Sequence, residues 1–182
     1  MSDGFRIEGT KTLLHSRVFD VERRTIVHEG ANFHRDVAVH RGAVAVLAIN
    51  ADGQIGLIRQ YRSTFDRSTW EIPAGTMDVD GEEPLATAQR ELLEEMGVTA
   101  SNWTLLGRFM NSPGWTDQVM TIYEARELSE GERAPAGPEE SSSSVHWLSR
   151  HDLRESLRAE PAVDCTMAVA LHRVFGDYFD GA

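Results

Sequence analysis

The sequence contains one cysteine, Cys165, and six prolines among 182 residues. A single cysteine excludes an intramolecular disulfide and a metal site made only of thiolates. The scarcity of proline, with 41% hydrophobic and 26% charged residues, indicates a globular chain rather than a disordered or fibrous one. A domain of this length is expected to bury about 70% of its unfolded surface.

Long apolar runs and positive charge are also scarce. No stretch reaches 18 apolar residues, and residues 1–14 (MSDGFRIEGTKTLL) have no apolar core, so we expect no signal peptide, no membrane span and a cytoplasmic protein. Lys and Arg number 18 against 29 Asp and Glu, a formal net charge of −11. We expect no nucleic-acid partner, because such affinity rests on phosphate neutralised by Lys and Arg. The acidity fits either solubility or a cluster of carboxylates for a metal.

The hydrophobic pattern predicts short strands for much of the chain. Residues 13–20, 21–29 and 33–40 alternate and are polar enough for a partly exposed sheet. The apolar run 43–50 (AVAVLAIN), a turn at 50–53 and the run 55–61 predict a hairpin. Further strands are expected at 68–72, 103–110, 119–125 and 145–148, with a polar loop over 128–142.

Three helices complete the predicted α+β fold. Pro84 suits a first helical position and Gly97 the position after the last turn, which predicts a helix over 84–96. Its buried face would carry Leu85, Ala88, Leu92 and Met96. Two more helices are expected at about 150–158 and 161–179, so a mixed sheet lies between helices in an α/β/α arrangement.

Three acids cluster on the predicted helix 84–96. Glu91, Glu94 and Glu95 fall within roughly 100° of arc. Arg90 can partner Glu94, but Glu91 and Glu95 are like charges four residues apart near the helix C-terminus, which destabilises a helix. The spacing alone leaves two interpretations open, a solvated acidic face or a site for a hard cation such as Mg²⁺.

The residues around this helix match a known motif. The second part of the Nudix box resembles Glu82 followed, after seven residues, by the run 90–98 (RELLEEMGV). The first part departs from the box, because six residues rather than five separate Gly75 from Glu82. The segments 59–62 (RQYR), 70–75 (WEIPAG), 78–82 (DVDGE) and 112–114 (SPG) are similar to those of the ADP-ribose pyrophosphatase branch of the Nudix hydrolase superfamily. The resemblance covers residues 40–150 best.

This resemblance implies a Nudix fold with an N-terminal antiparallel sheet. Residues 1–40 would form strands that dimerise and cap the substrate, and residues 41–182 would form the hydrolase domain. So few polar strands make no core alone and must pack on something, which the resemblance implies is a second copy in a homodimer; the alternative is that they cover the sheet of the same subunit in a monomer. Phe19 or Phe33 would stack on the adenine.

The resemblance also implies roles at the metal site. Glu91, Glu94 and Glu95 would bind Mg²⁺, with Mn²⁺ as a substitute, and the Ala74 carbonyl would complete one shell. Within the box, the residues implied to be structural are Gly75, Glu82, Arg90 and Gly97.

Substrate contacts and the general base lie outside the helix in this resemblance. Arg62 and Glu71, with Arg59 and Gly114, would contact the substrate. The base would come from the stretch 137–142, where Glu140 and its rival Glu139 both remain candidates. The chain departs from the family pattern at Gln118 and at the serines 141–144.

The predicted function is therefore Mg²⁺-dependent hydrolysis of ADP-ribose to AMP and ribose 5-phosphate. The alternatives are another nucleoside diphosphate derivative, such as GDP-mannose or another sugar nucleotide, FAD or NADH, or a module that binds ADP-ribose without cleaving it. Because all four box glutamates, 82, 91, 94 and 95, are present, the sequence favours an enzyme over a sensing module.

Overall fold

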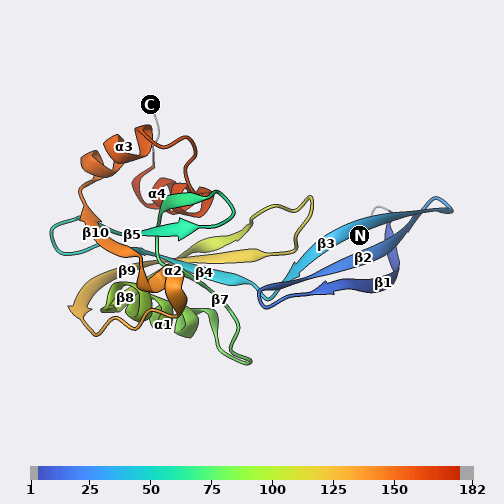
Figure 1. Cartoon of the computed structure of the whole chain (residues 1–182), viewed down its shortest axis with the longest axis horizontal. Coiled ribbons are helices and arrows are strands. Elements are labelled where there is room, and N and C mark those ends of the chain that lie inside the picture. Colours follow the sequence, from blue (N-terminus) through green and yellow to red (C-terminus); the bar gives the residue numbers. More distant parts are fainter. Residues whose placement is uncertain (1–3, 177–182) are drawn as a thin grey trace. The chain divides into compact units, whose positions relative to one another are not determined.

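A computed structural model describes residues 4–176 and divides them into two compact units (Figure 1). The first unit comprises residues 4–42 together with 109–119. The second comprises residues 43–108 and 120–176 and holds the apolar core.

The first unit is a three-stranded antiparallel sheet in the order β1-β2-β3. Its strands are β1 (Arg6–His15), β2 (Phe19–His28) and β3 (Ala31–His40). The prediction of a first strand at 13–20 was wrong, because the chain turns at 16–18. The Ser16 hydroxyl accepts the backbone N–H of Phe19 at 3.1 Å and competes there with a continuing ladder.

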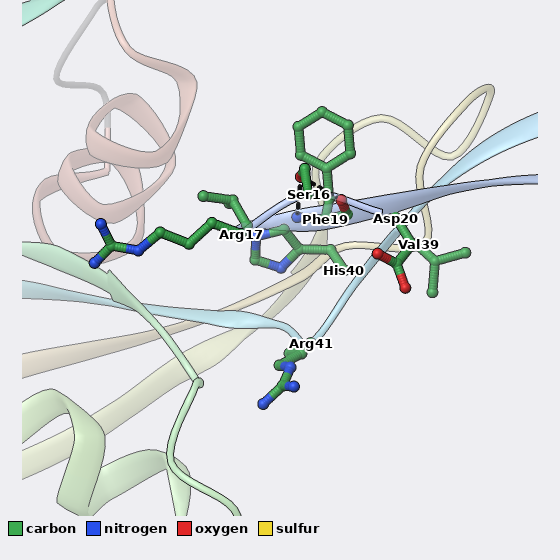
Figure 2. Close-up of a pocket in the computed structure, with 8 residues that line it drawn as sticks. Ser16, Arg17, Phe19, Asp20, Val39, His40 and Arg41 are labelled. Atoms are coloured by element: carbon green, nitrogen blue, oxygen red, sulfur yellow. Dashed lines mark hydrogen bonds between the residues drawn. The ribbon is translucent and has the colours of Figure 1, made fainter. Parts of the chain in front are cut away.

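Polar contacts, rather than a core, hold the first unit together. Arg23 forms a two-pronged ion pair with Asp36 across β2 and β3, with both N–O distances 2.8 Å. Residues 109–119 join β3, where the Ala38 N–H donates to the Trp115 carbonyl at 2.8 Å. A cavity of about 270 Å³ lies by the β1–β2 turn, and Arg17, Phe19 and His40 are among the residues that line it (Figure 2).

The second unit contains two sheets built from seven strands. The order in the larger sheet is β7-β4-β9-β8 and in the smaller sheet β10-β5-β6. The strands are β4 (Ala43–Ala48), β5 (Ile55–Arg62), β6 (Arg67–Glu71), β7 (Ala74–Thr76), β8 (Val98–Met110), β9 (Val119–Glu130) and β10 (Ser144–Leu148); the ends of β8 and β9 reach into the first unit.

The predicted hairpin between 43–50 and 55–61 was wrong in its pairing. Both strands exist, but β4 runs parallel to β9 and antiparallel to β7, whereas β5 pairs with β10 and β6. A single bridge, Ile49 to Ile55, joins the two runs. All six residues of β4 are buried, which is typical of a central strand with neighbours on both edges and cover on both faces.

Four helices belong to the second unit: α1 (Pro84–Met96), α2 (Gly137–Ser141), α3 (Arg150–Arg158) and α4 (Cys165–Phe175). Figure 1 shows α1 on one side of the sheets and α3 and α4 on the other, which confirms the α+β fold with helices about a mixed sheet. The part of the chain that the structure describes has no helix of the length and apolar character that a membrane crossing needs.

The helix predictions hold with small corrections. Leu85 is 36% exposed, so the buried face of α1 starts later, at Thr87 and Ala88. The last helix begins at Cys165 rather than 161, because the Asp164 carboxylate caps it by accepting the Met167 N–H at 2.7 Å. Residues 177–179 of that prediction lie outside the described residues. The predicted loop 128–142 contains the end of β9 and helix α2.

Candidate active site

The two ends of α1 and its buried face determine where its acidic side chains lie. Pro84 occupies the first turn, and Gly97 ends the helix in the left-handed conformation at φ 69°, with its N–H donating to the Leu93 carbonyl at 2.8 Å. Ala88 and Leu92 are fully buried. With Ala88 and Leu92 facing the core, the acidic positions of the helix lie toward β7.

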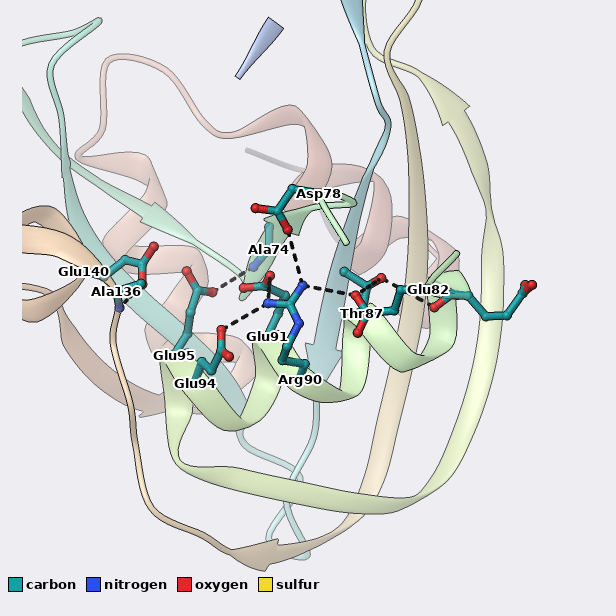
Figure 3. Close-up of polar contacts among 11 residues, drawn as sticks. Ala74, Asp78, Glu82, Thr87, Arg90, Glu91, Glu94, Glu95, Ala136 and Glu140 are labelled. Carbon is teal, nitrogen blue, oxygen red and sulfur yellow. Dashed lines mark hydrogen bonds and ion pairs between the residues drawn. The ribbon is translucent and has the colours of Figure 1, made fainter. Parts of the chain in front are cut away.

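Two of the three acids are buried. Glu91 is 9% exposed and Glu95 is 4% exposed, which a solvated acidic face would not produce. The Ala74 N–H donates to Glu95 at 2.9 Å, so the carboxylate lies against β7 (Figure 3). A β-carbon on Gly75 would lie 2.0 Å from the carboxyl carbon of Glu91, so a larger residue at this position would have to displace the Glu91 carboxylate.

Arg90 holds the acidic cluster together in Figure 3. Its Nη1 lies 2.6 Å from Glu91 Oε1 and 3.2 Å from Glu94 Oε2, while its Nη2 lies 3.2 Å from Glu82 Oε2. The structure thus pairs Glu82 with Arg90, two residues that the resemblance implied to be structural. It adds Asp78, whose Oδ1 is 3.8 Å from Arg90 Nη2 and which the sequence analysis did not single out.

The electrostatics of the cluster favour a bound cation. The pKa of Glu95 is raised to about 8, chiefly by burial and also by the charges of Glu91 and Glu140, while the Ala74 hydrogen bond and the charge of Arg62 oppose the rise. Burial also raises the pKa of Glu91, although Arg90 opposes this. Both carboxylates are therefore unfavourable as anions in the protein alone, and a nearby cation would reverse that.

The donor set fits a hard divalent cation. Glu91, Glu94 and Glu95 offer carboxylate oxygens, the ligand type that Mg²⁺ and Mn²⁺ take. Within residues 4–176, no three acidic, His or Cys side chains already converge on one point. The Arg90 guanidinium instead pairs with both Glu91 and Glu94.

The two candidate bases face different groups. Both lie on α2, where Glu140 accepts the Ala136 N–H at 2.6 Å. The charge of Glu140 raises the pKa of Glu91 and of Glu95, and Figure 3 shows Glu140 beside Glu95. The charge of Glu139 instead contributes to the raised pKa of Arg62.

The predicted substrate residues separate into three places. Arg62 and Glu71 form a two-pronged pair with N–O distances of 2.9 and 2.6 Å, and the Glu95 charge also acts on Arg62. Arg59 instead pairs with Glu160 and covers the Trp70 ring at 4.9 Å. Gly114 belongs to the first unit.

The site thus gathers helix-borne carboxylates and an arginine beside β7, the kind of donor set that a metal-dependent hydrolase uses. The model of the NUDIX domain family matches residues 39–167, and the chain belongs to that family. It is 36% identical over 174 residues to an ADP-ribose pyrophosphatase of Mycobacterium tuberculosis, covering 93% of this chain and 84% of that protein.

Two further likenesses agree with this membership. An ADP-ribose pyrophosphatase of Bacillus subtilis is 36% identical over 137 residues, which cover 75% of this chain and 74% of that protein. The crystal structure of an ADP compounds hydrolase superposes with a TM-score of 0.78 at 24% identity, over 94% of this chain and 92% of that one. The likeness to this crystal structure shows a shared fold. The chain is accordingly a Nudix hydrolase.

Proposed function

We propose that this protein hydrolyses ADP-ribose to AMP and ribose 5-phosphate in a Mg²⁺-dependent reaction, with Mn²⁺ as a working substitute. The observation that carries the proposal is the pair of buried carboxylates, Glu91 and Glu95, with Glu140 beside them. Support for the substrate comes from the two relatives of 36% identity that are named ADP-ribose pyrophosphatase.

The proposed cation is held by Glu91, Glu94 and Glu95, with the carbonyl of Ala74 as a further oxygen. The Ala74 N–H bond to Glu95 supports this, because it keeps that peptide beside the carboxylate. A bound divalent cation would neutralise phosphate charge and make an attacking water more acidic. Arg90 and Glu82 keep the acids in place before binding.

Glu140 is the proposed general base. In the reaction a water oxygen forms a bond to one phosphorus, the bridging P–O bond breaks, and the departing phosphate takes the electron pair. Glu140 accepts the proton that the water loses. Its charge already acts on Glu91 and Glu95, which favours it over Glu139, whose charge acts on Arg62.

Arg62 and Glu71 are the proposed contacts to the rest of the substrate. Their paired, half-buried groups present a cation and an anion on the strands next to the acidic cluster. Arg59 and Gly114 stay predictions, as does a cytoplasmic location. Because the carboxylates act on the diphosphate alone, GDP-mannose or another sugar nucleotide, FAD and NADH are the alternative substrates.

The test is a product analysis with purified protein. ADP-ribose, GDP-mannose, FAD and NADH are each incubated with Mg²⁺, with Mn²⁺ and with EDTA, and the products are separated by chromatography. We expect AMP and ribose 5-phosphate from ADP-ribose with either metal and none with EDTA. Faster cleavage of another substrate would reassign the specificity, and binding of ADP-ribose without any cleavage would indicate a sensing module.

Glu91→Gln is expected to lower kcat by orders of magnitude, because the variant loses an anionic metal ligand while keeping the size of the side chain. Circular dichroism should show an unchanged fold. Glu155→Gln on the exposed face of α3 is the matched control and should keep wild-type turnover. Near-wild-type activity of Glu91→Gln at saturating Mg²⁺ would refute the metal assignment.

We further propose that the protein is a homodimer in which the first unit packs on a second copy. No residue from 4 to 42 is buried, so this sheet has apolar surface without a core to hold it. Phe19 is the better candidate for stacking on the adenine, because it lines a cavity, whereas Phe33 already makes an edge contact with Phe5 and has Arg35 over its ring.

A further inference from the structure

The segment 131–134 closes the C-terminal end of α1, the helix that carries the acidic cluster. The Gly131 N–H donates to the Gly97 carbonyl at 2.8 Å, and the Ala134 N–H donates to the Glu94 carbonyl at 3.1 Å. Arg133 Nε donates to the Glu95 carbonyl at 2.5 Å. These carbonyls belong to the last turn and its cap, where a helix leaves acceptors without internal partners and where a cation is favourable.

The same arginine reaches α2 with its other nitrogens. Arg133 Nη2 lies 3.1 Å from the Glu140 carbonyl, and Nη1 lies 3.2 Å from the Ser143 carbonyl. Nη2 also donates to the Ser143 hydroxyl. One planar group with five N–H donors therefore connects the end of α1 to the end of α2.

Helix α2 has little of its own to fix its position. It comprises five residues, none of which is buried, and a helix this short is not stable by itself. At its N-terminus the Ala136 N–H donates to the Glu140 carboxylate of the same helix, a contact that ties α2 only to itself. The Arg133 bonds at its other end thus supply much of what sets its distance from Glu91 and Glu95.

The glycine that ends α1 permits this approach. A β-carbon on Gly97 would lie 3.3 Å from both the backbone nitrogen and the β-carbon of Arg133, and its φ of 69° is unfavourable for other residues. The positive φ thus favours glycine, and the absence of a side chain lets the Arg133 segment pack closely against the end of α1.

We propose that Arg133 is a positioning residue for the hydrolysis, one that holds α2 so that its glutamate faces the acidic cluster. This inference rests on the proposed function. Arg133 acts through α2 rather than on the substrate, so its loss should affect kcat far more than KM. A displacement of about 1 Å in a catalytic group lowers the rate by roughly 100-fold, and we expect a loss of about 10- to 100-fold.

The test compares Arg133→Ala and Arg133→Lys with the control Arg126→Ala. Arg126 is exposed on β9, where it forms an ion pair with Glu124. With ADP-ribose and Mg²⁺, Arg133→Ala should lose kcat as stated with KM changed less than about threefold, and millimolar guanidinium should restore part of the rate. Arg133→Lys should fall between, because one ammonium cannot span both helices. Arg126→Ala should match wild type.

Hydrogen exchange supplies a readout that does not depend on activity. The N–H groups of Ser142 and Ser143 donate to carbonyls within α2, those of Pro138 and Glu140. In Arg133→Ala these amides should exchange faster, while the amides of α1 before its last turn keep their protection. Unchanged exchange over 137–143 would overturn the inference, and if Arg133→Ala does not fold, Arg133→Lys takes its place.

A double-mutant cycle separates positioning from a general loss of structure. If Arg133 acts through Glu140, then Arg133→Ala added to Glu140→Gln should lower kcat by less than twofold more, because the benefit is already gone. Glu139→Gln replaces Glu140→Gln in the cycle if it is the more impaired variant. If the kcat losses of the two single variants multiplied in the double variant, the inference would be overturned. Absence of hydrolysis by wild type would contradict the proposed function, and hydrogen exchange would still decide whether Arg133 holds α2.

Discussion

At the scale of single residues, the acidic cluster is built against its own stability. Glu95 lies almost fully buried beside Glu91 and is influenced by Glu140, so three like charges act on one another in a region of low polarity. Such an arrangement is costly without a compensating cation. A site that must bind a cation destabilises the metal-free folded protein, and this loss can be measured as a lower thermal stability.

Glu95→Gln is expected to raise the thermal stability of the metal-free protein. The folded state holds the Glu95 proton up to a pKa of about 8, against the usual 4.5, so stability declines as pH rises from 4.5 to 8. A glutamine keeps the acceptor for the Ala74 N–H and has no such dependence. In EDTA, Tm should exceed wild type by about 3–8 °C at pH 8 and by less at pH 5.

Addition of Mg²⁺ should reverse this order. The wild type should gain Tm with metal, because a ligand that binds only the folded state stabilises it, whereas the variant should gain little. If Glu95→Gln were no more stable than wild type in EDTA at pH 8, the buried charge of Glu95 would not be destabilising as we infer.

Glu140→Gln should lower kcat about 10²–10⁴-fold with little change in KM, because a proton acceptor acts mainly in the transition state. Glutamine can still accept the Ala136 N–H, so α2 should keep its position. Glu139→Gln is the matched comparison one residue away and should alter KM more than kcat, since its charge acts on Arg62. Steady-state kinetics on both variants decides between the two glutamates, and wild-type kcat in both would mean that neither is the base.

The resemblance to the Nudix box pointed to Glu82 and Arg90, which the structure pairs at 3.2 Å, whereas no sequence pattern pointed to Arg133. Arg133 binds backbone carbonyls of Glu95, Glu140 and Ser143. Every residue has such a carbonyl, so no pattern of residue types reveals these partners.

At the scale of elements, local signals fixed α1 and failed for the strand pairing. A proline at the start and a glycine at the end act within a few residues, so the bounds 84–96 were correct. The partners of β4 and β5 depend on β9 and β10, which lie far along the chain. A short turn between two apolar runs carries no information about such distant strands.

The connection between α3 and α4 offers a prediction at this scale. Glu160 binds Arg59 of β5 and, at 3.0 Å, Arg67 of β6, so it ties the C-terminal helices to the smaller sheet. Glu160→Ala should lower the free energy of unfolding by about 1–3 kcal/mol, since two half-buried arginines lose their acceptor. Denaturant titration measures this change. The control Glu155→Ala, from an exposed pair with Arg158, should change it by less than about 0.5 kcal/mol, and equal effects would contradict the role of Glu160.

At the scale of the whole molecule, the two units differ in kind. The second unit has a buried core around β4 and α1, with Val46 and Leu92 fully buried. The first has a complete sheet and no buried residue from 4 to 42, while Ile7 is 57% exposed and Leu14 is also exposed. The polarity of these strands was predictable from sequence. That a second copy covers their apolar side chains stays a prediction.

We expect the two copies to form a twofold dimer whose interface buries well over about 2,000 Å² in total. Light scattering at low micromolar concentration should give about twice the chain mass of 20.3 kDa. Ile7→Asp or Leu14→Asp should shift the protein toward monomer, because a buried unpaired charge is costly. Leu105→Asp is the matched control, an exposed leucine of the second unit, and should leave the dimer intact. A fully active wild-type monomer would contradict both the dimer and any role of the first unit in a partner's site.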